Sequence, residues 1–293
     1  MTKVQFWSEG TLLAGDLYYP PNWKEGERCP GIVICHGWGQ SKDWGDATKP
    51  FQRHAERFAE CGWVALAFDY RGWGESGARV VVKDDLPAEP IEVTARVQVI
   101  RQVVDPYDWA WDVRHALDFL EGEDGVDPER LALWGTSFAG GVVTWTAAHD
   151  ARVKCVVSQV GLQDWSGAAA DDPARAQLGR QRAIELARGE VGPIPQGIDA
   201  VGLPGTPNFA KMRDWSALPF ADQIEVPVLL IDAEDEPLFD RHKNSELLYQ
   251  RMQAAGRVPV EYRVLEGANH GQAYFERWQE RSDLAVAWYQ EHL

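Results

Sequence analysis

The chain has 293 residues, of which 45% are hydrophobic, so it is long enough for one large domain with a sizeable core. Its formal net charge is −16 at pH 7. A surface this acidic repels phosphate backbones and anionic lipids, so we expect neither nucleic acid nor a membrane as a partner.

The N-terminal segment shows no basic region followed by an apolar stretch, and no window holds 18 uninterrupted apolar residues. We therefore predict neither a signal peptide nor a membrane span. The four cysteines form no CxxC pair, which gives no support for a zinc ribbon or a redox motif. Together these features predict a cytoplasmic protein, and they leave its oligomeric state open.

The first predicted element is a β-hairpin, because two β-rich runs flank Glu9 and Gly10. Six short runs rich in Val, Ile and Leu follow it. Continuous apolar runs of this kind are typical of strands buried on both faces of a parallel sheet. The runs lie at residues 31–39, 63–74, 131–137, 153–161, 226–233 and 260–267.

Helical patterns alternate with these runs. Such alternation predicts an α/β fold with a mostly parallel, twisted sheet and helices on both faces. The helical patterns cover roughly residues 48–60, 107–121, 138–149, 240–255 and 271–291.

Two long gaps interrupt the alternation, at residues 75–106 and 162–225. The second gap contains a helix-like segment and a Gly/Pro-rich stretch, and it is too long for a plain loop in a compact domain. We predict that residues 162–225 form a helical cap inserted into a core made of residues 1–161 and 226–293. The alternative is a surface subdomain with no role in binding.

The stretch LALWGTSFAGG places Ser137 at the end of an apolar run and among small residues. A sharp strand-to-helix turn that exposes a nucleophilic serine needs small residues two positions to either side, and Gly135 and Ala139 meet that need. The alternative for this stretch alone is a serine N-cap beside incidental glycines. The amide of Phe138, at the start of the following helix, would be one oxyanion donor.

A second oxyanion donor should come from the loop after an earlier core strand. That loop is HGWG, where the amide of Trp38 is the expected donor and Gly37 and Gly39 let the backbone approach a substrate. His36 in the same loop is expected to order it rather than to transfer protons.

The general base should follow the last strand, where His270 stands between Gly267 and Gly271. The acid that orients it should follow the preceding strand. We place Asp232 still within that strand and Asp240 at the N-cap of the next helix. The acidic residues available there are Asp232, Glu234, Asp235, Glu236 and Asp240.

The order of Ser137, an acid and His270, together with the HGWG loop and the DYRGWGES run, resembles the α/β-hydrolase superfamily over nearly the whole chain. The segments GDLYYP, CHGWG, RQVVDPYDWAWDVRHALDFL and GTSFAGG are most similar to the branch of dienelactone hydrolases and X-Pro dipeptidyl peptidases, which includes acyl esterases and polyketide-transferase-type proteins. Dienelactone hydrolases carry a cysteine nucleophile, so Ser137 disfavours that activity here. The fifth position of the elbow is Ala139 where the family has Gly.

The resemblance also bears on the acid. Many α/β-hydrolases read PVLLI-x-G-x-x-D at this strand, and that pattern laid on PVLLIDAEDE without a gap puts the acid at Glu236. A shift of one residue in the turn would put it at Asp235. Glutamate can serve because the acid's role is to accept the imidazole N–H and stabilise the imidazolium.

These residues predict a serine hydrolase, a carboxylic ester hydrolase that cleaves an ester or thioester through an acyl-enzyme. The alternatives are acyl transfer, hydrolysis of a lactone or carbon–carbon bond, and a binding protein without catalysis. We expect no metal and no cofactor, because no metal-ligand or phosphate-binding motif is present. Aromatic walls would suit a small apolar or aromatic acyl substrate. Several tryptophans fall near predicted strand ends or in the two long gaps: Trp38, Trp73, Trp109, Trp165 and Trp215.

In the DYRGWGES run, Arg71 is expected to make a structural ion pair with Asp69 or Asp105 rather than to bind substrate.

Overall fold

The computed structural model describes residues 1–44, 49–167, 172–192 and 202–293. Its centre is an eight-stranded sheet in the order β1-β2-β4-β3-β8-β9-β11-β12. The first two strands are an antiparallel hairpin that pairs antiparallel with β4, and every later pairing in the sheet is parallel. The predicted hairpin and the predicted α/β fold with a mostly parallel sheet are confirmed.

All six predicted core runs form strands of this sheet. Their carboxyl ends lie at one edge, which is where ligands bind in open α/β sheets. The strands are β1 (Thr2–Ser8), β2 (Thr11–Tyr18), β3 (Cys29–Cys35), β4 (Val64–Phe68), β8 (Val126–Thr136), β9 (Val153–Gln159), β11 (Val228–Asp235) and β12 (Val260–Asn269).

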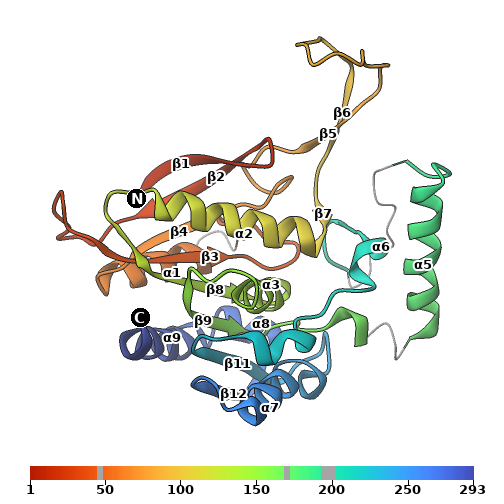
Figure 1. Ribbon diagram of the computed structural model, residues 1–293. Helices are drawn as coiled ribbons and strands as arrows, with labels where there is room; N and C mark the ends of the chain where they lie inside the picture. The colour runs from red at the N-terminus through yellow and green to blue at the C-terminus, as the bar shows by residue number, and fades with distance from the viewer. Residues whose placement is uncertain (45–48, 168–171, 193–201) are drawn as a thin grey trace.

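Helices cover both faces of the sheet, as Figure 1 shows. Side chains alternate along each strand, so Val33 packs into the core that includes α2, α3 and α7, and its neighbour Ile34 packs into the core with α1, α8 and α9. The helices are α1 (Pro50–Glu60), α2 (Pro106–Glu121), α3 (Phe138–Ala147), α7 (Ser245–Ala255), α8 (His270–Tyr274) and α9 (Trp278–His292).

Two predicted helices are broken near their beginnings. The pattern at 271–291 divides into α8 and α9, because the backbone leaves helical geometry between Phe275 and Arg277. The pattern at 240–255 opens with a 3₁₀ turn, η3 (Arg241–Lys243), which Asp240 caps through a bond to the His242 amide, and α7 then starts afresh after Asn244. Asp240 therefore is a cap, but of this turn and not of the main helix.

The 75–106 gap contains a two-stranded antiparallel ribbon, β5 (Arg79–Val82) and β6 (Val97–Ile100), which projects from the body in Figure 1. We call residues 79–100 the arm. The chain then returns through β7 (Val103–Val104) to α2.

The 162–225 gap contains α5 (Pro173–Ala187), β10 (Thr206–Pro207), α6 (Phe209–Met212) and the 3₁₀ helix η2 (Leu218–Gln223). Its strand β10 pairs in parallel with β7, so the two gaps meet in a small second sheet.

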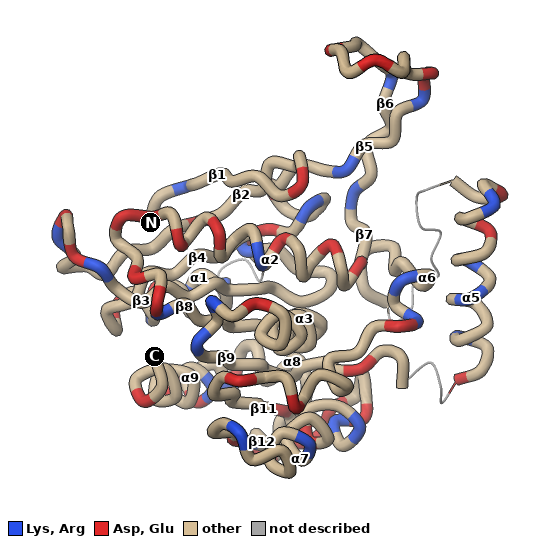
Figure 2. The backbone as a smooth tube through the Cα atoms, in the orientation of Figure 1, with Lys and Arg blue, Asp and Glu red and all other residues tan. Residues whose placement is uncertain are grey.

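Charged side chains occur on most elements, with both signs interspersed, as Figure 2 shows. No helix among the described residues is long and apolar enough to cross a membrane.

Candidate active site

Ser137 stands between β8 and α3 with φ 55° and ψ −127°, a strained conformation for a residue with a side chain. The turn is tight: a Cβ added to Gly135 would come within 2.5 Å of the Ala139 carbonyl oxygen and within 2.8 Å of the Val143 side chain. No larger residue fits at position 135 without a shift of the backbone. The geometry is that of a sharp strand-to-helix turn, which the small residues around Ser137 predict.

Backbone hydrogen bonds hold this turn in place. The Ser137 amide donates to the Gln159 carbonyl at the end of β9 (2.8 Å), and the Ser137 carbonyl accepts from the amides of Gly140 (2.9 Å) and Leu162 (3.1 Å). The serine is thereby tied to its own helix and to the neighbouring strand. Such restraint can maintain a backbone conformation that costs energy by itself.

The two residues expected to supply oxyanion donors, Trp38 and Phe138, line the same pocket as Ser137. Phe138 is the first residue of α3, so its amide is one of the N–H groups that a helix leaves without an internal partner. Trp38 follows β3, and its ring lies 6.0 Å from the Phe138 ring. The Gly37 amide donates to Gln40 Oε1 (2.8 Å) and is therefore occupied.

His36 is buried in the same loop. Its Nδ1 contacts the Gly37 carbonyl (3.0 Å), and its Nε2 lies 3.4 Å from the Tyr70 amide. Burial lowers the pKa of His36, against the smaller opposing effect of Asp69. These contacts are those of a residue that orders the loop.

His270 and Glu236 form a close pair. The Nδ1 of His270 lies 2.6 Å from Oε2 of Glu236, and 11% of the histidine side chain and 1% of the glutamate side chain are exposed. His270 begins α8, directly after β12, and Glu236 follows the end of β11. A carboxylate on Nδ1 leaves Nε2 as the ring nitrogen that can accept a proton.

Asp235, the alternative acid, is exposed at the last position of β11. The register of β11 against β12 shifts there: Ala233 pairs with Leu265, and Asp235 pairs with Asn269. This irregularity carries the chain past the end of β12 and brings Glu236, the next residue, to His270.

The other acids near this strand end have different partners. Glu234 accepts from the Gly267 amide (2.7 Å). Asp232 is buried within β11 and accepts from the hydroxyls of Ser245 and Tyr262, both at 3.1 Å. Burial raises the pKa of Asp232 to about 7.

Tyr274 is a buried neighbour of both Ser137 and His270 that the sequence analysis missed. Its ring lies 5.7 Å from the His270 ring, and its hydroxyl accepts from Oγ1 of Thr136 (3.0 Å), the residue next to Ser137. Burial raises the pKa of Tyr274, so the phenol is neutral. Tyr274 lies one helical turn after His270, and this spacing could have indicated from the sequence that the two side chains are neighbours.

Ser137 opens into a pocket. The predicted tryptophans separate here: two line the pocket, whereas Trp73, Trp109 and Trp215 are buried in the core. Among the described residues of the lining, Arg175 is the one that carries a charge, and nothing in the sequence pattern marked it. The lining residues are Trp38, Ser137, Phe138, Leu162, Trp165, Arg175, Leu203, Leu238 and Phe239.

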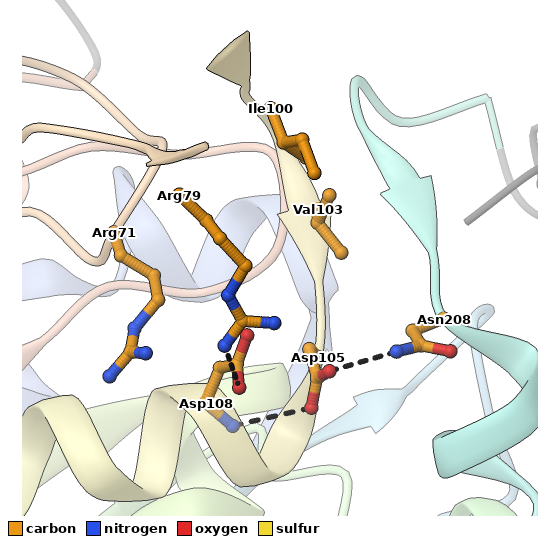
Figure 3. A pocket seen from close by; sticks show the side chains of 7 residues that line it. All are labelled: Arg71, Arg79, Ile100, Val103, Asp105, Asp108 and Asn208. Carbon is orange, nitrogen blue, oxygen red and sulfur yellow. Dashed lines mark hydrogen bonds and ion pairs between the residues drawn. The ribbon is translucent and has the colours of Figure 1, made fainter. Parts of the chain in front are cut away.

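A second pocket lies at the base of the arm, shown in Figure 3. It holds a dense ionic network in which Arg79 pairs with Asp108 (2.9 Å) and Asn208 donates to Asp105 (2.8 Å). Arg71, which also lines this pocket, makes structural ion pairs as expected, but its partners are not the expected Asp69 or Asp105. The Arg71 guanidinium pairs with Asp112 of α2 (2.6 Å) and with Glu9 of the β1–β2 turn (2.8 Å). The two expected partners are engaged elsewhere: Asp69 accepts from the amides of Lys42 and Glu75, and Asp105 contacts Asn208 and Lys211.

Within the part of the chain that the structure describes, no group of three or more His, Cys, Asp or Glu residues could hold a metal ion.

The chain was compared with known proteins. Residues 32–284 match the profile of the family described as "Alpha/beta hydrolase family". The crystal structure of the alpha/beta hydrolase GrgF from Penicillium sp. sh18 superposes with a TM-score of 0.72 at 20% identity, covering 99% of this chain and 98% of that one.

Two curated relatives align with parts of the chain. The quorum-quenching protein AidA of Acinetobacter baumannii (strain MDR-ZJ06) is 32% identical over 55% of this chain and 44% of its own length. The thiohydrolase aneE of Aspergillus aculeatus is 31% identical over 54% of this chain and 40% of its own length. In each case the match spans less than half of the relative.

Proposed function

Because the chain belongs to the alpha/beta hydrolase family, we propose that it is a serine hydrolase that cleaves a carboxylic ester or thioester through an acyl-enzyme. The observation that carries the proposal is the buried Glu236–His270 pair at 2.6 Å, which lies at the same end of the sheet as a strained Ser137 that opens into an apolar pocket. A nucleophilic serine needs a base and a group that orients that base, and these three residues supply each part.

In this mechanism Ser137 Oγ attacks the carbonyl carbon while His270 Nε2 takes its proton. Glu236 holds the ring through Nδ1 and stabilises the imidazolium that forms. His270 then gives the proton to the leaving alcohol or thiol, and the acyl group stays on Ser137. A water molecule, deprotonated by His270, attacks the acyl-enzyme and releases the acid.

The negative charge that develops on the carbonyl oxygen needs donors fixed before the reaction starts. We assign this role to the amides of Trp38, which follows β3, and Phe138, which begins α3. The positive end of the α3 dipole adds to the stabilisation.

The pocket supports an apolar or aromatic acyl group as substrate, because aromatic and aliphatic side chains form nearly all of its lining. We also propose that residues 162–225 act as a cap on the core formed by residues 1–161 and 226–293. Trp165, Arg175 and Leu203 come from this segment and line the pocket, and the carbonyl of Pro204 accepts from Trp38 Nε1 (3.0 Å). The thiohydrolase name of aneE favours testing thioesters beside oxygen esters.

Hydrolysis of p-nitrophenyl esters and S-acyl N-acetylcysteamine thioesters, from acetyl to decanoyl, tests the proposal. Wild type should turn over at least one series, and Ser137→Ala should lose roughly 10³-fold or more in kcat. Equal rates for the two proteins would overturn it. Product that forms only with an added alcohol or amine would instead assign acyl transfer.

A further inference from the structure

The position of Arg175 is fixed by close packing of the helix that carries it. Gly179 lies one turn further along α5 and so on the same face, and a Cβ added there would approach the Phe209 carbonyl oxygen to 2.8 Å and the Arg213 Cβ to 2.9 Å. This contact seats α5 against α6. The face of α5 that bears Arg175 therefore points toward the body of the protein.

The Arg175 guanidinium lies at the edge of an apolar site. Its Cζ is 4.9 Å from the centroid of the Trp165 ring, and 31% of the side chain is exposed. Among the described residues, its one carboxylate neighbour is Asp172, with Oδ2 at 3.9 Å from Nε, beyond hydrogen-bond distance. The other Asp172 oxygen caps α5 by accepting from the amides of Ala174 and Arg175.

A guanidinium stays charged at any physiological pH and presents up to five N–H donors in a fixed plane that matches carboxylate and phosphate oxygens. An apolar acyl chain alone would gain little from such a group in its wall. The protein as a whole is strongly acidic, with a net charge of −16, so an anionic substrate is repelled unless a cation receives it.

We propose that Arg175 forms an anion subsite of the acyl pocket and binds a carboxylate or phosphate group of the substrate, at a point remote from the bond that is cleaved. This inference rests on the proposed function and refines it: the substrate is an ester or thioester that also carries a negative charge. Trp165 supports the guanidinium plane and keeps it oriented.

The first test compares monoesters that differ only in their far end. Mono-p-nitrophenyl adipate and suberate carry a terminal carboxylate, and their methyl-capped diesters do not. Wild type should show a kcat/KM for the carboxylates roughly 5- to 20-fold above that for the capped esters. Arg175→Gln should remove this preference by lowering kcat/KM for the carboxylates far more than for the capped esters, and Arg175→Lys should keep part of the preference.

Arg180→Gln is the matched control, because Arg180 is exposed on the same helix and is not among the residues that line the pocket. An equal loss in both variants would mean a general effect of surface charge and would overturn the subsite. A wild type that does not distinguish carboxylates from capped esters would overturn it as well.

A second arm of the experiment separates the two sources of the anion. Acyl-coenzyme A places phosphates on the leaving thiol, whereas the matching N-acetylcysteamine thioester has none. If Arg175→Gln lowers kcat/KM only for the coenzyme A thioesters, the anion that Arg175 binds is a phosphate. If it lowers kcat/KM only for the dicarboxylic monoesters, the anion is a carboxylate of the acyl chain.

Binding to Ser137→Ala keeps the inference separate from catalysis. Suberic acid monomethyl ester should change the tryptophan fluorescence of this variant, and the further change Arg175→Gln should weaken its Kd about tenfold. Dimethyl suberate should bind both proteins equally. If no ester or thioester is turned over, the proposed function fails, and these Kd values still decide the subsite; equal Kd values for the monomethyl ester would overturn it.

Discussion

The two segments that interrupt the core, residues 75–106 and 162–225, differ in how they pack against the rest of the protein. Both are attached near the same edge of the sheet, and they touch through β7 and β10. The second segment packs back onto the body and supplies four side chains to the Ser137 pocket, those of Leu162, Trp165, Arg175 and Leu203. The arm in the first segment projects from the body and supplies none.

The arm leaves an apolar face uncovered. Val80 pairs with Val99 and Val82 with Val97, so the four valines share one side of the ribbon. Each is at least 39% exposed, and the arm holds seven of the thirteen exposed large hydrophobic side chains of the described residues. Only its base is tied down, by Arg79 to Asp108 and by backbone contacts near Gly72.

The difference shows that the length of a gap indicates an insertion but not its role. What separates the two segments is local contact. Gly179 lets α5 approach α6 closely, and Asn208 joins the segment to Asp105 at the start of α2. Within the described part of the chain, no side-chain hydrogen bond or ion pair joins residues 80–99 to the body; the ion pair of Arg96 with Asp84 lies within the arm. If this account is correct, changes in the core should exceed those in the packed segment, and changes on the arm should be smallest.

The largest effect should come from the core. Glu236→Gln keeps the shape of the side chain but removes its charge from His270 Nδ1, so kcat/KM for a p-nitrophenyl ester should fall roughly 10²- to 10⁴-fold. Asp235→Asn, one residue away and exposed, should stay within about threefold. A larger loss in the Asp235 variant would reverse the assignment of the acid.

The packed segment should come next. Gly179→Val forces α5 away from Phe209 and Arg213, which shifts Arg175 and Trp165 at the pocket wall. We expect kcat/KM for long-chain esters to fall about tenfold, mainly through KM, while kcat for acetate changes little. Gly192→Ala is the control, since a Cβ there meets nothing within 4 Å. Equal activity of all three proteins would show that the seat of α5 does not matter for binding.

A pH effect on stability should arise in the core, independently of both segments. The raised pKa of Asp232, about 7 when folded, means that the native state holds this proton more strongly than the unfolded chain. Its stabilising contribution is therefore complete below the unfolded pKa near 4 and is lost as pH rises through about 7.

Urea unfolding followed by circular dichroism can measure this effect. As pH rises from 4 to 8, wild type should lose stability relative to Asp232→Asn. The difference between their free energies of unfolding should shift in favour of the variant by at most about 4 kcal/mol. A constant difference across this range would show that Asp232 is not protonated in the folded protein.

The smallest effect should be that of the arm. The double change Val80→Thr and Val99→Thr should leave kcat/KM within about twofold and the free energy of unfolding within roughly 0.5 kcal/mol. The same exchange at a buried strand position, Val33→Thr, should cost about 1–3 kcal/mol because it buries a hydroxyl. A comparable cost on the arm would mean that its valines are covered in solution.

Much of the fold was predictable because buried parallel strands have a plain signature. Runs such as GIVIC and PVLLI hold little besides apolar residues, and small residues around Ser137 mark the turn after β8. The break between α8 and α9 was not predictable, because the apolar pattern continues across Phe275 while the backbone changes direction.

Site residues that directly follow a strand could be predicted from the sequence. Site residues whose position depends on tertiary contacts could not. Ser137 and His270 follow strands directly. Glu236 needed a family pattern, since the register shift between Ala233 and Asp235 leaves no trace in the sequence. Arg175 reaches the pocket only through the packing of α5, so no local pattern could reveal it.

The most direct test of the central claim is covalent labelling with a fluorophosphonate, followed by intact mass and peptide mapping. The account predicts one phosphonyl adduct, on the peptide that contains Ser137. It also predicts slower labelling in Glu236→Gln and none in Ser137→Ala. An unlabelled wild type, or an adduct that persists in Ser137→Ala, would contradict the assignment of Ser137 as the nucleophile.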